Sequence, residues 1–365
     1  MHLPSVIVVG GGAMGSSAAR ELARSGHAVT VLEQHDRLHH HGSSHGTSRI
    51  MRFVYDDPFY VRLAVEARPL WDELQLTTDL ELLRITGGVD HGPRRLLEPF
   101  AAALDEVGLS YEWLLPGEAA RRWPGMRFDE AVLFQPDAGV THPDNTMVAL
   151  QRDAESHGAQ WHTQTRVVRI EETPDGVTVA AADRVFTADQ VVLTTGVWTS
   201  LLATLPVEAA TQVQPAHFVA IEPGSAWPTF IHRRADGSGR PIPEAYGLPS
   251  PEGVKVGFHG GGKPVDPDDR DFAVVAQELE DLRAYATDWL PGVDPASLDA
   301  GTCLYGGLAE DDFLIDRSGR VTVAIGFSGH GFKFVPLVGR MVAGLVAGTA
   351  RPEPRFTISA HRPTV

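Results

Sequence analysis

A glycine-rich segment near the start of the chain carries the most specific chemistry in the sequence. Residues 6–15 read Val-Ile-Val-Val-Gly-Gly-Gly-Ala-Met-Gly, an apolar strand followed by the glycine pattern of a dinucleotide-binding turn. Gly10 permits the tight turn, Gly12 lets the backbone approach a pyrophosphate, and Gly15 lets the next helix pack closely on the strand. The free N–H groups at the start of that helix attract phosphates.

Glu33 ends the next apolar run, residues 28–33, where a carboxylate can accept hydrogen bonds from ribose hydroxyls. A free 2′-hydroxyl is implied, so the pattern favours FAD or NAD over NADP. The alternative is a glycine-rich turn in another kind of α/β protein. The strand, helix, second strand and acidic residue together favour dinucleotide binding.

A second glycine-rich segment, residues 326–334, reads Gly-Phe-Ser-Gly-His-Gly-Phe-Lys-Phe. Such a run is costly unless the backbone must come close to a flat or charged group. We expect the following helix to present a positive pole, with Lys333 in its first turn, that would stabilise the negative charge of a reduced flavin. A simple turn between strand and helix is the alternative.

Strands and helices must position these segments. Hydrophobic periodicity predicts a helix ending near residue 24 and further helices over residues 60–74, 96–107, 116–123, 143–157, 272–289 and 334–346. Strands are predicted over residues 82–90, 165–171, 177–181, 190–196, 216–221, 254–259 and 321–326.

The order of these elements predicts an α/β protein with a discontinuous Rossmann-like dinucleotide-binding domain. We expect this domain to be built from residues 1–84, 141–209 and 311–365. A mostly antiparallel β-sheet substrate domain is expected from residues 85–140 and 210–310. The site should lie in the crevice between them.

Composition limits the partners and the compartment. The 365 residues carry a formal net charge of −16, which argues against nucleic acid or an anionic membrane as a partner. Cys303 is the single cysteine, so no intrachain disulfide is expected and a reducing, cytoplasmic setting fits. The first strand begins too early for a signal peptide, and the longest apolar stretch, residues 332–346, is too short to span a bilayer. The histidines at 39–41 are read as a loop, and no metal site is expected.

At the level of whole segments, the sequence resembles the monomeric sarcosine oxidase family of FAD-dependent amine oxidases, which includes N-methyltryptophan oxidase. The resemblance rests on the opening fingerprint and on five further segments that follow in the family's order. These segments are residues 44–52, 246–249, 255–259, 302–305 and 326–334. The resemblance therefore implies a small-molecule amino acid substrate, dioxygen as the second substrate, FAD as the cofactor of the Rossmann-like domain, and a monomer.

Site roles follow from the resemblance, position by position. Cys303 matches the cysteine that bonds covalently to the flavin, although a lone buried cysteine can also be a small hydrophobe. Arg52 and Lys333 match the pair that holds the substrate carboxylate, and their alternative is an ordinary surface cation. Lys255 matches the lysine that activates dioxygen, and it would otherwise point to water.

Arg49, Tyr246, His259 and Tyr305 match residues that line the site over the flavin, with Tyr246 on the substrate and the other three assigned to catalysis. His259 could equally be a histidine satisfied at a domain boundary. The expected cofactor-binding set comprises Gly10, Gly12, Ala13, Met14, Gly15, Glu33, Ser43, Ser44, Ser48, Arg49, Ile50, Val167, Gly196, Trp198, Cys303, Gly329, Gly331, Phe332 and Lys333.

The implied reaction is hydride transfer from a secondary amino acid to FAD, imine hydrolysis, and reoxidation by dioxygen to give hydrogen peroxide. Two positions depart from the family: Ala245 is smaller than the methionine expected of a sarcosine oxidase, and residues 251–253 shorten the loop before Lys255. Both predict a pocket reshaped for another side chain. The alternatives are a biosynthetic oxidase of a cyclic imino acid such as proline or pipecolate, an NAD-dependent dehydrogenase, and a non-catalytic flavin-binding protein.

Overall fold

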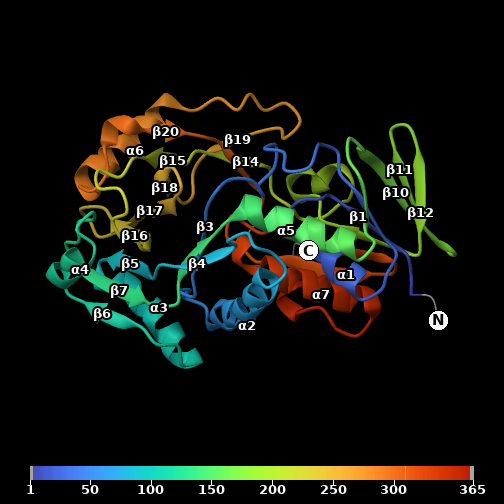
Figure 1. Cartoon of the computed structure of the whole chain (residues 1–365), viewed down its shortest axis with the longest axis horizontal. Coiled ribbons are helices and arrows are strands. Elements are labelled where there is room, and N and C mark those ends of the chain that lie inside the picture. Colours follow the sequence, from blue (N-terminus) through green and yellow to red (C-terminus); the bar gives the residue numbers. More distant parts are fainter. Residues whose placement is uncertain (1–2, 309, 362–365) are drawn as a thin grey trace.

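A six-stranded, largely parallel sheet forms the centre of one half of the molecule (Figure 1). The computed structural model describes residues 3–308 and 310–361. In spatial order the strands are β22 (Leu314–Ser318), β23 (Val321–Ile325), β13 (Gln190–Leu193), β1 (Val6–Val9), β2 (Val29–Leu32) and β9 (Gln160–His162). Only the β22–β23 pair is antiparallel within these described residues. Strand β1 is buried along its whole length, as expected for a strand covered on both faces.

Both faces of this sheet are covered. One face packs on four helices, α1 (Ala13–Arg24), α2 (Pro58–Gln75), α5 (Pro143–Ser156) and α7 (Val335–Ala347). The other face packs on a three-stranded antiparallel sheet, β10 (Val167–Thr173), β11 (Gly176–Ala181) and β12 (Val185–Ala188). Alternate residues of β1 serve the two cores: Val6 and Val8 face the helices, and Ile7 and Val9 face the small sheet.

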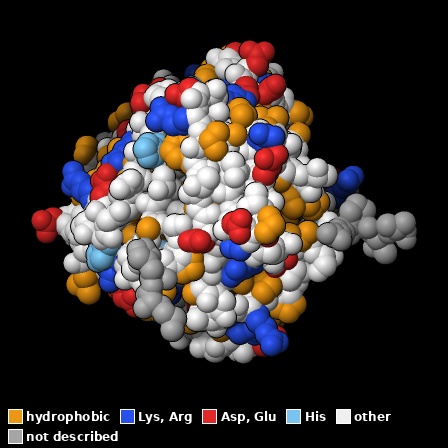
Figure 2. Space-filling view, turned by 90° about the vertical axis from the view of Figure 1, so that its right-hand side faces the viewer, with side chains coloured by type: hydrophobic (Ala, Val, Ile, Leu, Met, Phe, Trp, Pro, Cys, Tyr) orange, Lys and Arg blue, Asp and Glu red, His pale blue; other side chains and the backbone are white. Residues whose placement is uncertain are grey.

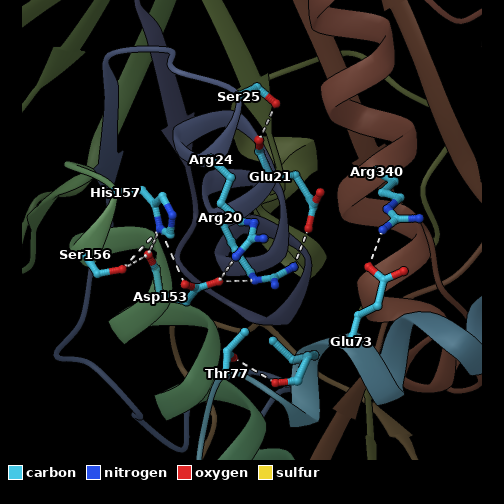
Figure 3. A network of polar contacts seen from close by, with 11 residues as sticks. Arg20, Glu21, Arg24, Ser25, Glu73, Thr77, Asp153, Ser156, His157 and Arg340 are labelled. Atoms are coloured by element: carbon cyan, nitrogen blue, oxygen red, sulfur yellow. Dashed lines mark hydrogen bonds and ion pairs between the residues drawn. The ribbon is translucent and has the colours of Figure 1, made fainter.

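Ion pairs tie these helices to one another (Figure 3). Asp153 of α5 accepts from Arg20 at 2.5 Å and from Arg24 at 3.1 Å, both on α1. Arg340 of α7 pairs with Glu73 of α2 at 2.5 Å. The helix layer is therefore fixed by charge pairs along its rim as well as by its apolar core.

A mixed eight-stranded sheet forms the other half (Figure 1). Its strands in order are β20 (Asp299–Ala300), β15 (Ala216–Phe218), β18 (Gly253–Phe258), β17 (Pro241–Ser250), β16 (Thr229–Ala235), β5 (Gly88–Gly92), β7 (Ala131–Gln135) and β6 (Glu112–Leu114). Among the described strands of this second sheet, only β16 and β5 pair in parallel. One face packs on α4 (Pro116–Arg122) and α6 (Ala276–Trp289), and α3 (Arg94–Val107) contacts β5 and β7.

Smaller elements connect the halves. Two short sheets are formed by β3 (Arg49–Met51), β8 (Gly139–Thr141) and β4 (Leu83–Ile85), and by β19 (Lys263–Pro264), β14 (Thr211–Val213) and β21 (Cys303–Tyr305). The 3₁₀ turns are η1 (Gly196–Leu201), η2 (Pro295–Ser297), η3 (Phe332–Phe334) and η4 (Pro354–Phe356). Within the described ranges, every helix is too short or too polar to cross a membrane. On the face that carries β10–β12, basic and acidic side chains are interspersed (Figure 2).

The predicted elements are confirmed within a few residues, with two corrections. The single strand expected over residues 82–90 is wrong: β4 and β5 lie in different sheets, because Gly87 turns the chain at φ +70°. The helix expected from Phe272 begins at Ala276, since Phe272 has φ +56° and cannot continue a right-handed helix.

Candidate active site

One large cavity, of about 920 Å³, runs between the glycine turn after β1 and the inner face of the eight-stranded sheet. All of the predicted site residues line it except Gly15. The structure therefore brings together segments from the beginning, middle and end of the chain.

The glycine turn has the geometry that its sequence requires. Gly10 adopts φ +98°, and a Cβ there would lie 2.5 Å from the carbonyl oxygen of Thr194. A Cβ at Gly15 would lie 1.9 Å from the carbonyl oxygen of Gly10, so α1 rests directly on the turn. Gly12 caps the helix without a side-chain hydrogen bond, and Ser44 Oγ accepts from the N–H of Ala13 at 2.9 Å. The helix N-terminus thus faces the cavity and can receive phosphates.

Glu33 is buried at the same end of the cavity. Its carboxylate accepts from the N–H of Gly11 at 2.7 Å and from the N–H of His35 at 2.9 Å. Burial alone would raise its pKa, but hydrogen bonds from His39, His35 and Gly11 hold the pKa below its usual value. The Glu33 carboxylate is therefore held in the position where it could accept hydrogen bonds from ribose hydroxyls.

Histidines surround Glu33 without forming a metal site. His39 Nε2 lies 3.4 Å from Glu33 Oε1, and the rings of His35 and His41 stack with centroids 4.1 Å apart. Across residues 3–308 and 310–361, no group of three or more His, Cys, Asp or Glu side chains is placed to hold a metal ion.

Polar contacts also join the segments that line the cavity near Glu33. Ser43 Oγ donates to the carbonyl of Leu304 at 2.6 Å, and Trp198 Nε1 donates to Asp268 Oδ1 at 2.8 Å. Other predicted cofactor residues that line the cavity are Met14, Ser48, Ile50, Val167, Gly196, Gly329, Gly331 and Phe332.

The eight-stranded sheet presents alternate residues to the cavity. Tyr246 on β17 and Lys255 on β18 line the cavity, as does His259 just past the end of β18. Ala245 points the other way and packs in the apolar core with Phe230. The expectation that Ala245 reshapes the pocket is therefore wrong, because a neighbouring residue on a strand faces the opposite side of the sheet.

The shortened loop before Lys255 also lies away from the cavity lining. Ser250 pairs with Gly253, which leaves a two-residue turn between β17 and β18. Glu252 in this turn accepts from Thr47 Oγ1 at 2.8 Å. The turn thus anchors the segment that carries Arg49, and it does not shape the described cavity wall.

Lys255 is buried in the cavity wall with 8% of its surface exposed, so the alternative that it points to water is wrong. Its Nζ lies 3.5 Å from the carbonyl oxygen of Ser48. Burial, and then the positive charge of Arg49, lower the pKa of Lys255 to about 7. Lys255 therefore exchanges a proton near neutral pH.

Arg49 and Cys303 meet at the cavity. Arg49 Nη2 lies 3.7 Å from Cys303 Sγ and donates to the carbonyl of His45 at 2.8 Å. Arg49 Nη1 donates to the carbonyl of Ser48 at 2.9 Å. These carbonyls fix a positive charge beside the buried sulfur.

Two tyrosines pack against glycine backbone on the cavity wall. A Cβ at Gly257 would lie 2.6 Å from the Tyr246 ring, and a Cβ at Gly329 would lie 2.5 Å from the Tyr305 ring. Burial raises the pKa of both phenols, so they stay neutral and can donate hydrogen bonds. The second glycine-rich segment is therefore needed for close approach of an aromatic ring.

Lys333 and Arg52 occupy the far end of the cavity. Lys333 is 4% exposed, and its Nζ donates to Tyr55 Oη at 2.8 Å and to the carbonyl of His330 at 2.6 Å. Burial and the nearby charge of Arg52 lower the pKa of Lys333. Lys333 lies in η3 and not in the first turn of α7 as expected, because α7 begins only at Val335.

Several cavity residues were not expected from the sequence. They are His45, Tyr55, Ile231, Arg233 and Glu244, joined by Asp90, which contacts Arg52 and Arg233 just behind the wall. Burial raises the pKa of Asp90, and the charges of Arg233 and Arg52 oppose that rise. Side chains alternate between the two faces of a strand, so Tyr246 could have indicated that Glu244 faces the cavity as well. Asp90 lies behind the cavity wall because of strand pairing, which no local sequence pattern reveals.

Comparison with known proteins agrees with this geometry. The sequence matches the family described as FAD dependent oxidoreductase over residues 5–345. Monomeric sarcosine oxidase of Streptomyces avermitilis is 35% identical over 369 aligned positions, which cover 95% of each chain. N-methyl-L-tryptophan oxidase of Salmonella typhimurium is 28% identical, over 98% of this chain and 97% of that protein.

The solved structure of NikD, described as an unusual amino acid oxidase essential for nikkomycin biosynthesis, has the same architecture. It superposes with a TM-score of 0.85 at 26% identity, over 97% of this chain and 96% of NikD. By sequence and by fold, the chain belongs to the FAD dependent oxidoreductase family, in the branch that includes the monomeric sarcosine oxidases and N-methyl-L-tryptophan oxidases.

Proposed function

We propose that this protein is an FAD-dependent oxidase that acts on the CH–NH group of secondary amino acids, with sarcosine or another N-methyl amino acid as substrate. One observation carries the proposal. A single cavity joins the glycine turn at Gly10 to a buried cationic end at Arg52 and Lys333, with Lys255 in its wall.

The residues present fit FAD. The N-terminus of α1 would receive the phosphates and Glu33 the ribose, while the cavity wall at Cys303 and Tyr305 would hold the ring system. A Cβ at Gly10 or Gly15 would collide with backbone, so the turn is built for close approach. FAD supplies the two-electron acceptor for oxidation of the amine.

Arg52 and Lys333 would hold the substrate carboxylate. Arg52 Nη1 is buried and makes no hydrogen bond with the described residues, so a carboxylate would supply its missing acceptor. The same anion would favour the charged form of Lys333, whose pKa burial lowers. Positive charge at this end also lowers the pKa of the substrate amine and favours its neutral form, which has the lone pair that assists C–H cleavage.

Lys255 would activate dioxygen, because a fixed cation lowers the cost of placing the first electron on oxygen. The overall reaction then yields hydrogen peroxide and an imine. Water hydrolyses the imine, and an N-methyl substrate releases formaldehyde. His259, Arg49 and Tyr305 complete the cavity wall around the reacting groups.

We also propose that Cys303 would bond covalently to FAD: a thioether would replace the S–H bond and one C–H bond of a ring methyl group, and dioxygen would take up the two electrons and two protons released. Its sulfur is buried in the cavity wall, 3.7 Å from Arg49 Nη2, where the ring system of FAD would be held.

The domain division proposed from the sequence is supported by strand pairing. Residues 88–135 and 216–300 supply all eight strands of the second described sheet. A monomer is supported by the likeness to the monomeric sarcosine oxidases, and a cytoplasmic setting by the lone free cysteine. Light scattering coupled to gel filtration would test the first, and fractionation of the source cells the second.

A substrate panel with a peroxide readout tests the function. Sarcosine, larger N-methyl amino acids, proline and pipecolate would be compared by initial rates, with the matching primary amines as controls. Turnover of N-methyl amino acids supports the proposal, whereas preference for proline or pipecolate would establish the cyclic alternative. No peroxide with any member, from protein that contains FAD, would refute an oxidase.

A further inference from the structure

A chain of alternating charges extends from the carboxylate-binding end of the cavity along the inner face of the eight-stranded sheet. In order it contains Arg52, Asp90, Arg233 and Glu244. Asp90 lies on β5, opposite Ile231 in the parallel β5–β16 pair. Ile231 and Arg233 are two residues apart on β16 and share the cavity face.

Asp90 is held firmly from one side. It is 3% exposed, and its Oδ1 accepts from Arg233 Nη2 at 2.9 Å. Arg233 is fixed in turn by Glu244, which accepts from its Nη1, and by the ring of Phe100, whose centroid lies 3.6 Å from the guanidinium carbon. Asp90 therefore has little freedom to move.

Arg52, in contrast, has few contacts of its own. Asp90 Oδ1, 3.5 Å from Arg52 Nη1, is the carboxylate oxygen within ion-pair range of Arg52 in the described structure. The Tyr55 ring lies 5.2 Å from the guanidinium carbon as a cation–π partner, and the Tyr55 phenol also interacts with Arg52 through a side-chain hydrogen bond. Arg52 Nη1 makes no hydrogen bond with any described residue although it is buried. Asp90 therefore supplies a negative charge against Arg52, beside the neutral contact with Tyr55.

We propose that Asp90 is a positioning residue that, held by Arg233, fixes the Arg52 guanidinium where it meets the substrate carboxylate. This inference rests on the proposed function, because it needs Arg52 to bind that carboxylate. No family pattern in the sequence pointed to Asp90.

Loss of the Asp90 charge has two opposing effects on carboxylate binding. It removes an anion near the bound carboxylate, which would tighten binding. It also removes the counter-charge of a long, flexible cation that is 19% exposed and can turn toward solvent. The second effect is larger, because an Arg52 side chain that has turned toward solvent must be reordered at every binding event.

Asp90→Asn tests the proposal, since it keeps the shape and the acceptor for Arg233 but removes the charge. Isobutyrate and its neutral analogue isobutyramide would be titrated into FAD-loaded protein by calorimetry, which measures binding without turnover. We expect the Kd of isobutyrate to rise about tenfold, equivalent to about 1.4 kcal/mol, with the Kd of isobutyramide unchanged. In steady state the same variant should raise KM far more than it lowers kcat.

Asp153→Asn is the matched control. Asp153 also bridges two arginines with a largely buried carboxylate, but it lies in the helix layer (Figure 3) and does not line the described cavity. It should lower thermal stability and leave both Kd values unchanged. Arg233→Gln removes the partner that holds Asp90 from its other side. It should weaken the binding of isobutyrate by a smaller factor and leave the binding of isobutyramide unchanged, so the proposal does not depend on one variant folding well.

The outcomes distinguish a failure of the proposed carboxylate site from a failure of the role assigned to Asp90. Wild-type protein that binds isobutyrate no better than isobutyramide would overturn the carboxylate end of the proposed function, and this inference with it. A wild-type preference for isobutyrate that Asp90→Asn leaves unchanged or strengthens would overturn the role of Asp90 alone.

Discussion

Substitution of Lys255 by methionine should have two opposite effects. It should slow catalysis, because it removes the proposed catalytic charge, and it should stabilise the folded protein, because that charge is buried at a cost in free energy. Burial lowers the pKa of Lys255 from 10.5 to about 7, and each pKa unit corresponds to about 1.36 kcal/mol. The buried cation therefore costs up to about 5 kcal/mol of folding free energy. Because the folded-state pKa is the lower one, this cost is full below pH 7 and disappears as pH rises toward 10.5. Lys255→Met should thus be more stable than the wild type at pH 6, by several kcal/mol at most.

The same variant should lose speed in one half-reaction. Stopped-flow spectroscopy would follow reduction by substrate without oxygen, and then reoxidation by dioxygen. We expect Lys255→Met to slow reoxidation by at least tenfold and to change reduction little. In the wild type, the cationic fraction of a group with a pKa of about 7 falls about tenfold from pH 6 to pH 8. The rate of reoxidation should therefore fall as pH rises. An anion bound beside Lys255 would move the midpoint of this fall to a higher pH, but the rate would still decrease with rising pH.

Lys263→Met is the matched control, because Lys263 is 39% exposed and pairs with Asp271 away from the cavity lining. It should change neither half-reaction. Equal slowing of reduction and reoxidation in Lys255→Met would refute the assigned role of Lys255.

Three further predictions follow from the same geometry. Cys303→Ser should leave FAD bound but extractable by acid, whereas acid-precipitated wild type should stay yellow; absorbance of the supernatant decides, and full release from the wild type would exclude the covalent bond. Gly15→Ala would place a Cβ 1.9 Å from the carbonyl oxygen of Gly10 and should lower stability by about 2–4 kcal/mol or prevent folding, as thermal unfolding would show. Tyr55→Phe removes an acceptor of the Lys333 ammonium and should raise KM several-fold with kcat little changed; an unchanged KM would exclude a role for that hydrogen bond.

The parts of the site that could be predicted are those encoded by local spacing. Gly10, Gly12 and Gly15 identify a turn whose geometry depends on a few consecutive residues, and the structure has that turn. The general division into a parallel and a largely antiparallel sheet also follows from the order of the elements. Family resemblance, and not spacing, indicated Arg52 and Lys333 for the other end of the cavity.

The parts that could not be predicted depend on long-range register. Asp90 lies beside Arg233 because β5 pairs in parallel with β16, which places residues far apart in the chain side by side. Ala245 was expected to reshape the pocket because it is smaller than the methionine of the family, but the pleat turns it into the core. The burial of Lys255 likewise depends on neighbouring strands β15 and β17, not on the sequence around it.

The alternation of β17 and β18 limits how this protein and its relatives can diversify. An inserted or deleted residue within either strand would exchange Tyr246 with Ala245, or Lys255 with Val256, and would destroy chemistry and core together. Changes of length are therefore tolerable only beyond the strand ends, as in the exposed turn at residues 236–240 that joins β16 to β17. A library for new substrates should accordingly vary every second position of these strands and leave their lengths untouched.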